Sequence, residues 1–534
     1  MRNLLVSGVA CLALVAGFLL VRDQDVSRAQ TAAPSAKVRP MAVAGSFYPA
    51  DPAVLGTMID GFLAKATPPA IDGVVALVAP HAGYEFAGPV AAYSYALLKG
   101  RKFDRVVVIA PSHYEAFGFS SVYDGAAYTT PLGQVPVDRA FAAKLAGMSR
   151  QIRLSPAGHT PSPDKLEHSI ETQLPYLQKV IGPFQLVPIV MGDQSYEACR
   201  ALGVALAKLA QGTNTLIVAS SDLSHYHPYA DAVRIDRKTL QAIEEWDYLS
   251  MSRNFEQRVW EACGGGPIIA TMIAAERLGA KQAKVLKYLN SGDTAGDKSR
   301  VVGYGAVAFV KAPPHAAARE EVFSLSRKEQ DELLRIARAS VETSVRRGKP
   351  FESQTSGMSA LAQERGAFVT LNEHGQLRGC IGYVAPMKPL DETVREVAML
   401  AALRDTRFHP VTPAELGSLE YEVSVLSPMR RVMDVKEIRV GTHGLLIRMG
   451  DSEGLLLPQV PVDQKWDRAE FLEEVCLKAG LPPHAWQDPN ADLFRFTALV
   501  FGERRAPEPV IPGADVPLTR TAAPWPAAQG SPRP

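Results

Sequence analysis

The stretch that decides the fold is RVVVIAPSH, residues 105–113. Its run of valine and isoleucine, with no polar residue inside, is typical of a strand that is buried on both faces. Three further short runs have the same character, at 74–80, 185–191 and 215–220. Helical patterns separate these runs, and the alternation predicts an α/β fold with a largely parallel sheet flanked by helices.

Helices are expected in the segments between these strands. Asp51 followed by Pro52 is typical of a helix start, because aspartate accepts hydrogen bonds from free backbone N–H groups and proline fits the first turn. The predicted helices cover residues 51–66, 167–181, 196–209, 234–245 and 267–278.

Polar side chains follow three of the predicted strands at the point where each strand ends. His81 follows the first run, His113 follows the second, and Asp222 and His225 follow the last. Ligands of open α/β sheets bind outside the carboxyl ends of the strands. We therefore expect these side chains to converge although they are far apart in the sequence.

Cys263 is a further candidate for the same site. It precedes three glycines and a predicted helix with Pro267 in its first turn, and a helix N-terminus favours the thiolate form that binds metals. The segment EHSIE, residues 167–171, adds polar groups. A single cysteine is also often a small buried side chain, and Asp222 could simply cap a turn. The residues alone thus indicate an enzyme-like α/β domain with a candidate His/Cys site.

The composition excludes several classes of protein. The chain has 534 residues, of which 47% are hydrophobic and 21% are charged, as in ordinary globular proteins. This excludes a chain that is disordered overall, a collagen-like chain and a coiled-coil rod. The net charge of +1 gives no overall attraction to nucleic acid or to an anionic membrane. Five cysteines are too few for a scaffold built on disulfides.

The N-terminal segment, residues 1–30, predicts where the rest of the chain is placed. Residues 4–21 read LLVSGVACLALVAGFLLV, an apolar run with arginine on both sides. Such a run is typical of a signal peptide or of an N-terminal membrane anchor, and a buried core helix is a third interpretation. The first two interpretations predict an exported chain, periplasmic or anchored to the outer face of the cytoplasmic membrane, with this segment as its only membrane contact.

Composition divides the rest of the chain into two folded blocks. The first covers residues 38–312, a linker rich in proline and alanine covers 313–323, and the second block covers 324–504. The tail, residues 505–534, is rich in proline and alanine and is expected to be disordered.

The second block is expected to have an α+β fold. Residues 368–384 predict a hairpin with a turn near 373–375, and residues 444–460 predict another with a turn at 450–454. A helix is expected over 468–479, with Asp467 as its cap.

The first block resembles the Memo family over nearly its whole length. The shared motifs include VAGSFYPADP (43–52), APHAGYEFAGP (79–89), EHSIETQLPYLQ (167–178), SSDLSHYHPY (220–229) and CGGGPIIA (263–270). The resemblance implies a fold similar to that of class III extradiol dioxygenases of the LigB type, which bind non-haem Fe(II) with two histidines and a glutamate. The Memo pattern has a cysteine in place of the carboxylate.

Carried onto this chain, the resemblance implies a metal site. His81, His113 and Cys263 would be the metal ligands, with Asp222 and His225 lining the site. A set of nitrogen and sulfur ligands suits iron(II) or copper, with zinc as a further candidate. A thiolate is more easily oxidised than a carboxylate, so the ring-cleaving activity of the dioxygenases does not follow from the resemblance.

The second block resembles the AMMECR domain family. The shared motifs include LRGCIGYV (377–384), DTRFHPVTPAEL (405–416) and GLLLPQV (454–460). Its most distinctive motif contains Arg378 and Cys380, which are either a further candidate site or part of a tight strand crossing in which Cys380 is buried. In bacteria the two families often occur beside a radical SAM protein, as the AmmeMemoRadiSam system, so the resemblance implies such a partner.

Three functional hypotheses remain open, and it stays open whether the chain is an enzyme. The first is a dioxygenase-like, metal-dependent oxidoreductase for an unidentified small molecule, in which His225 is the acid/base and Asp222 orients a ligand or His225. The second is a metal-binding or substrate-binding module without catalysis. The third links the AMMECR block to RNA modification, but the net charge does not favour nucleic acid as a partner.

Overall fold

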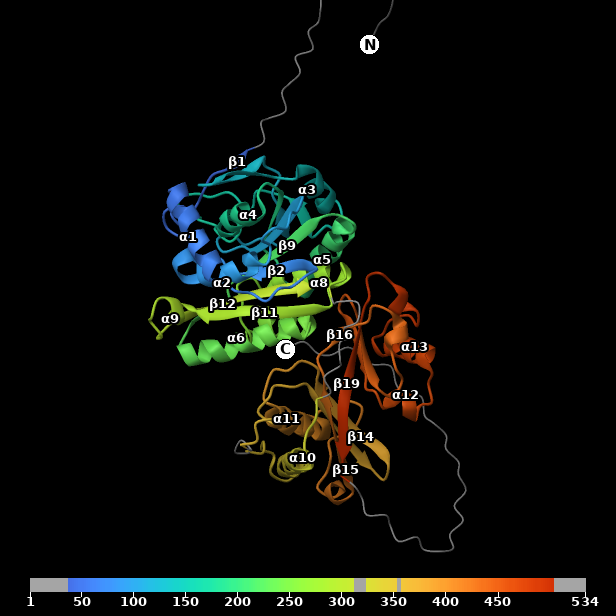
Figure 1. The fold of residues 1–534 in the computed structure, drawn as a ribbon. Coiled ribbons are helices and arrows are strands. Elements are labelled where there is room, and N and C mark those ends of the chain that lie inside the picture. The colour runs from blue at the N-terminus through green and yellow to red at the C-terminus, as the bar shows by residue number, and fades with distance from the viewer. Residues whose placement is uncertain (1–36, 312–322, 353–356, 504–534) are drawn as a thin grey trace, which may run out of the picture. The chain divides into compact units, whose positions relative to one another are not determined.

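The structure is a computed structural model that describes residues 37–311, 323–352 and 357–503 (Figure 1). The predictions for the N-terminal segment 1–30 and the tail 505–534 lie outside the described residues, as does the linker 313–323 apart from Phe323. None of the helices in the described ranges is long and apolar enough to cross a membrane.

The four predicted strands form the centre of the sheet in the first block. They are β2 (Val74–Ala79), β3 (Arg105–Pro111), β8 (Gln185–Met191) and β9 (Thr215–Ser220). They lie in the order β2-β9-β3-β8, and within this group of four every pair of adjacent strands is parallel. Their carboxyl ends therefore meet at one edge of the sheet.

The two strands that flank the central four are antiparallel to them. On one side β12 (Val301–Val310) pairs with β2, and β11 (Gln282–Asn290) pairs with β12. On the other side β4 (Ser120–Val122) pairs with β8. The parallel arrangement thus holds for the centre of a mixed sheet. Two short strands complete it, β7 (Ile152–Leu154) and β10 (His225–His227).

Both faces of the central strands are covered, and this explains their continuous apolar runs. Val107 and Ile109 belong to one apolar core, whereas Val106 and Val108 belong to another on the opposite face. Successive side chains of a strand alternate between its two faces. In a strand that is buried on both faces, every position therefore contacts an apolar core and favours an apolar residue.

The helices predicted over 51–66, 196–209 and 267–278 begin within two residues of the expected start, whereas the one predicted over 234–245 begins five residues earlier, at Tyr229. In α1 (Pro52–Lys65) the carboxylate of Asp51 accepts hydrogen bonds from the backbone N–H groups of Ala53 and Val54. The other helices of this block are α2 (Tyr84–Ala96), α3 (Arg139–Ala146), α4 (Leu174–Ile181), α5 (Tyr196–Ala210), α6 (Tyr229–Glu244), α7 (Tyr248–Glu256), α8 (Gly265–Arg277) and α9 (Ser291–Thr294). A separate small sheet contains β1 (Val38–Arg39), β5 (Ala127–Thr130) and β6 (Gly133–Pro136).

The helix predicted over 167–181 begins later than expected. A short 3-10 turn, η1 (Glu171–Gln173), leads into α4, and residues 167–170 are not helical. The carboxylate of Glu167 accepts hydrogen bonds from the backbone N–H groups of the two residues that follow it, His168 and Ser169. These local hydrogen bonds compete with a helical start, and they turn residues 167–169 toward the ends of the central strands.

The second block has the predicted α+β character. Its sheet order is β14-β13-β15-β19-β17-β18, and β16 pairs with β19. The strands are β13 (Ala367–Glu373), β14 (Gln376–Tyr383), β15 (Leu419–Leu426), β16 (Arg430–Arg431), β17 (His443–Met449), β18 (Ser452–Leu456) and β19 (Asp492–Gly502). The helices are α10 (Arg327–Arg347), α11 (Leu390–Leu403), α12 (Val460–Asp463) and α13 (Arg468–Lys478).

Both predicted hairpins are present in this block. His374 and Gly375 form the first turn with φ angles of 51° and 75°. These are the left-handed values that a two-residue hairpin turn of this type requires. The second turn is shorter than predicted. Met449 pairs with Ser452, so the turn is Gly450-Asp451, and Gly454 lies inside β18. Asp467 caps α13 as expected.

A buried histidine predicts how the stability of the first block depends on pH. Burial lowers the pKa of His159 to about 4, whereas the unfolded chain takes up this proton near pH 6.5. The unfolded state therefore binds more protons between these values, and stability falls as the pH falls, by up to about 3 kcal/mol from this group. We expect His159→Gln to weaken the pH dependence of the unfolding free energy between about pH 6.5 and 4. Denaturant titrations of parent and variant that stay parallel over this range would contradict the expectation.

Candidate metal site at the carboxyl ends of the strands

Three histidines gather at the edge of the sheet where the central strands end. His81 follows β2, His113 follows β3, and His168 precedes η1. One ring nitrogen from each of the three lies within 4.8 Å of the others. The structure thus places His81 and His113 together, as the sequence led us to expect, and adds His168 from the 167–171 segment as their third neighbour.

The hydrogen bonds of these histidines determine which ring nitrogen is free. Nδ1 of His113 lies 3.1 Å from a carboxylate oxygen of Glu167, and Nδ1 of His168 lies 3.3 Å from the carbonyl oxygen of Leu166. Both partners can only accept hydrogen bonds, so in the neutral ring Nδ1 carries the proton and Nε2 carries a lone pair. The same holds for His225, whose Nδ1 lies 2.8 Å from the carbonyl oxygen of Leu223.

In His81 the lone pair also lies on Nε2, which is 3.2 Å from the sulfur of Cys263. Its Nδ1 lies 2.9 Å from the hydroxyl oxygen of Ser220, whose own proton is donated to the carbonyl oxygen of Ser169. Ser220 can therefore only accept from His81. All four histidines of this region share one tautomer, the one that offers Nε2 to a metal.

Two other histidines of the first block are bound differently. Nε2 of His159 donates to the carbonyl oxygen of Ser121, and Nε2 of His227 lies 2.8 Å from the carboxylate of Glu261. In both, the nitrogen that would bind a metal is used by the protein. This contrast separates the four histidines at the sheet edge from histidines with a structural role.

Burial and mutual repulsion keep two of the histidines neutral. Burial, together with the neighbouring histidines, holds the pKa of His81 well below its usual value. Burial and His113 lower the pKa of His168 to about 4. For His113, burial also opposes the charged form, but the hydrogen bond and charge of Glu167 outweigh it and raise the pKa. Neutral imidazole is the form that binds metals.

Cys263 lies beside the three histidines. Its sulfur is 3.2 Å from Nε2 of His81 and accepts a hydrogen bond from the backbone N–H of Asp222 at 3.3 Å. The tightest group of ligand atoms is nevertheless the three histidines. The structure thus shows a His/His/His group with the thiol at its side, where the sequence predicts His/His/Cys.

The expectation that the helix start lowers the pKa of Cys263 was wrong. Burial, followed by the charge of Asp222, raises the pKa of this thiol. The first N–H group beyond the cysteine, that of Gly264, donates to the hydroxyl of Ser221, and the hydrogen bonds that lower the pKa of the thiol do not outweigh burial. The start of α8 also lies very close to β9, since a Cβ on Gly264 would be 2.5 Å from the carbonyl oxygen of Ser220.

Two carboxylates hold the histidines in place. Asp222 is buried and accepts a hydrogen bond from the backbone N–H of His81 at 2.8 Å, and burial raises its pKa. Glu167 accepts from both the backbone N–H and the ring of His113, and its pKa is lowered to about 2, because these hydrogen bonds outweigh the effect of burial. Sequence reasoning named the segment 167–171 but gave Glu167 and His168 no specific role. The feature of the sequence that could have indicated their roles is a glutamate directly before a histidine, Glu167-His168.

The candidate residues of the second block have separate partners. Arg378 donates to the carboxylate of Glu415 at 2.7 Å. Cys380 donates its backbone N–H to Asp405 and accepts from Arg407 at its backbone carbonyl, while its sulfur accepts a hydrogen bond from Thr370. Burial raises the pKa of the thiol. Because β14 ends the sheet, Asp405 and Arg407 satisfy edge groups that lack a strand partner. A functional site at Arg378 and Cys380 stays a prediction.

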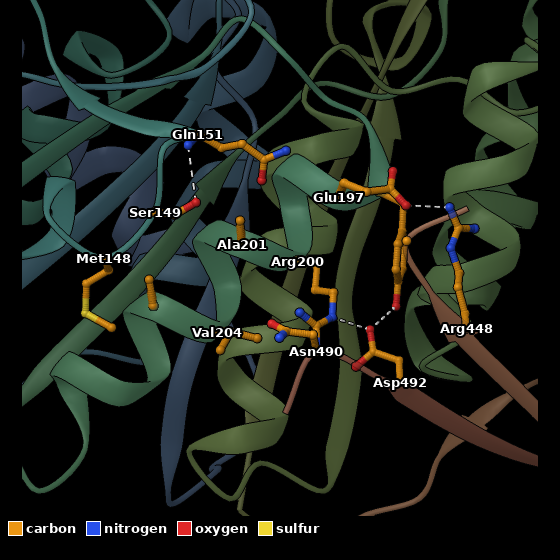
Figure 2. Close-up of a pocket in the computed structure, with 13 residues that line it drawn as sticks. Met148, Ser149, Gln151, Glu197, Arg200, Ala201, Val204, Arg448, Asn490 and Asp492 are labelled. Carbon is orange, nitrogen blue, oxygen red and sulfur yellow. Dashed lines mark hydrogen bonds and ion pairs between the residues drawn. The ribbon is translucent and has the colours of Figure 1, made fainter. Parts of the chain in front are cut away.

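Figure 2 shows a pocket at a different place, lined by α5 and by residues of the second block. Arg200 of α5 donates to Asp492 at 2.6 Å, and Arg448 donates to Glu197 at 2.5 Å. None of the four histidines at the sheet edge lines this pocket. Its charged groups are paired with one another, and it is separate from the candidate metal site.

The fold and the histidine cluster together define a two-domain protein, in which an α/β domain with a candidate metal site precedes an α+β domain. A family model described as Memo-like protein matches residues 39–308, and a model described as AMMECR1 matches residues 334–501. The chain belongs to the Memo-like protein family and also carries an AMMECR1 domain.

Relatives of known sequence or structure match one part of the chain at a time. The MEMO1 family protein MK0963 of Methanopyrus kandleri is 38% identical, over 51% of this chain and 98% of its own length. Protein TK0174 of Thermococcus kodakarensis is 46% identical, over 33% of this chain and 92% of its own. The crystal structure of the uncharacterized protein PH0010 from Pyrococcus horikoshii matches with 40% identity and a TM-score of 0.33, over 34% of this chain and 94% of that one.

The side-chain cap on β14 predicts a measurable contribution to stability. Asp405 accepts hydrogen bonds from a backbone N–H and a guanidinium. Asp405→Ala is therefore expected to lower the free energy of unfolding of the full chain by about 2 to 3 kcal/mol. Asp451, exposed in the turn between β17 and β18, provides the control. Its replacement by alanine should change stability by less than about 0.5 kcal/mol. Equal effects of the two substitutions in denaturant titrations would show that the edge cap contributes nothing.

Proposed function

We propose that the Memo-like domain is a metal-dependent redox enzyme that acts on a small molecule. The observation that carries the proposal is that ligand nitrogens of His81, His113 and His168 lie within 4.8 Å of one another, while the hydrogen bonds at Nδ1 leave the lone pair of each ring on Nε2. In His113, His168 and His225 the protein's hydrogen bonds are made by Nδ1, and in His81 the contact of Nε2 is with the sulfur of Cys263, itself a candidate ligand.

The residues present fit a transition metal. Three imidazole nitrogens with a sulfur at their side form a donor set suited to iron(II), copper or zinc. In this proposal Nε2 of His81, His113 and His168 hold the metal, and Cys263 joins them once its thiol has lost its proton. When bound, such a metal supplies Lewis acidity and, for iron or copper, electron transfer.

The protein's own side chains supply positioning and proton transfer. Asp222 fixes the backbone at His81, and Glu167 fixes both the backbone and the ring of His113, so two of the three histidines are held by carboxylates. His225 keeps its proton on Nδ1 and offers the lone pair of Nε2, which makes it the candidate to accept a proton from a substrate. We also propose that the AMMECR1 domain acts in the same pathway, because one chain joins the two.

Metal content is the first test of this proposal. The full chain, purified without chelator, is expected to hold close to one metal ion per molecule by elemental analysis. His113→Ala and His168→Ala should each lose most of it, while His227→Ala should keep it, because Nε2 of His227 is bound to Glu261. A parent protein that takes up none of iron, copper or zinc would exclude the metalloenzyme. Loss of metal in the His227 variant as well would show a general effect of unfolding.

Turnover is tested separately from binding. Metal-loaded protein is expected to consume O₂ with catechols or thiols offered as substrates, and His225→Ala should retain the metal but lose about 100-fold in rate, the size of a typical acid/base contribution. If fully loaded protein consumes no O₂ with any of them, the dioxygenase-like activity is excluded for these substrates. A metal-binding module without turnover would then be the better description.

A further inference from the structure

We propose that Ser220 and Gln173 are positioning residues that select the tautomer of His81. The inference deepens the proposed function, since a free Nε2 on His81 matters most for a bound metal. It rests on a chain of hydrogen bonds that links Tyr95 of α2, Gln173, Ser220 and the ring of His81. Each hydrogen bond in the chain can run in only one direction.

Ser220 at the end of β9 is the member that touches the histidine. Its hydroxyl has a single proton, which is donated to the carbonyl oxygen of Ser169 at 2.5 Å. The oxygen then has only lone pairs to offer to Nδ1 of His81, 2.9 Å away. His81 must therefore be the donor, and its proton stays on Nδ1.

Gln173 restrains the hydroxyl of Ser220, because its amide occupies one lone pair of that oxygen and excludes the orientation of the proton toward the amide. The side-chain nitrogen of Gln173 lies 3.0 Å from the carbonyl oxygen of Pro80 and 2.8 Å from the hydroxyl oxygen of Ser220. Since the carbonyl oxygen can only accept, the amide must present its NH₂ group here, and one N–H is directed at Ser220. The amide oxygen faces away and accepts a hydrogen bond from the hydroxyl of Tyr95.

The chain is closed to water. Ser220 and Tyr95 are completely buried, and Gln173 and His81 are only 1% exposed. No solvent molecule can replace a missing partner without opening the interior. The tautomer of His81 therefore depends on side chains, whereas His168 and His225 are held by backbone carbonyl groups two residues away, which no substitution removes.

Replacing Ser220 is the direct test. Ser220→Ala removes the acceptor for Nδ1 and should shift His81 toward the tautomer with the proton on Nε2. The measurement is nitrogen NMR of histidine-labelled, metal-free full-length protein, with the signal of His81 assigned by its loss in His81→Gln. In the same variant the affinity for Zn²⁺, measured by competition with a chelator, should fall by about 10- to 100-fold.

Ser94 provides a matched control. It is a completely buried serine whose hydroxyl donates to the carbonyl oxygen of Val78 in the neighbouring strand β2. Ser94→Ala thus also deletes a buried hydroxyl and its hydrogen bond to a backbone carbonyl, but it leaves the contacts of His81 intact. It is expected to change neither the nitrogen signals of His81 nor the affinity for Zn²⁺.

Two further variants keep the test decisive if Ser220→Ala does not fold. Ser220→Thr restores the hydroxyl and should restore the parent tautomer. Gln173→Met removes the N–H that restrains Ser220, so the hydroxyl can then also donate to His81, and the tautomer should shift in the same direction as in Ser220→Ala but by less. Unchanged nitrogen signals of His81 in every folded variant that lacks the hydroxyl or the amide would overturn the proposal.

The two proposals fail in different experiments. The tautomer is read on metal-free protein, so a shift in the Ser220 or Gln173 variants supports the positioning role whether or not the parent binds metal. Failure of the parent chain to bind any metal would sink the proposed function and leave the positioning role standing. A parent that binds metal, together with an unchanged tautomer in the variants, would sink only the positioning role.

Discussion

The parallel register of β2, β9 and β3 is the constraint on which the rest of the first domain depends. Ala79 lies opposite Ser220, and Ala219 lies opposite Ile109, so the three strands end within a few residues of one another. The residues of the candidate metal site either follow these strand ends or pack against the residues that do. The register thus brings together side chains that are more than a hundred residues apart in the sequence. The site is partly buried, so both desolvation and neighbouring charged groups shift the pKa values of its histidines.

Much of this arrangement could be predicted from the sequence, because burial on both faces demands an unbroken apolar run. The runs at 74–80, 105–111, 185–191 and 215–220 have no other simple interpretation, and the rule about strand ends then locates His81 and His113. Helix caps such as Asp51 and turns such as His374-Gly375 are also local, and local chemistry decides them.

What could not be predicted depends on contacts between distant side chains. The segment 167–170 has a helical pattern, but the carboxylate of Glu167 binds the N–H groups that a helix would need and brings His168 to the site. The pKa of Cys263 follows from burial and from Asp222 rather than from the helix start. In the second domain, no pattern indicates that Asp405 and Arg407 cover the backbone of Cys380. Each of these outcomes needs the packed structure to be known first.

The glycine at the start of α8 has a consequence for how far the site can adapt. With no room for a Cβ between Gly264 and the end of β9, the separation of helix and strand is set by hard contact between main-chain atoms. The backbone that carries Cys263 is therefore held close to the end of β9, next to the strand that precedes His81. A larger residue at 264 would widen the separation of helix and strand. In the proposed metal site, residue 264 would thus influence the spacing of the ligands without contacting the ion.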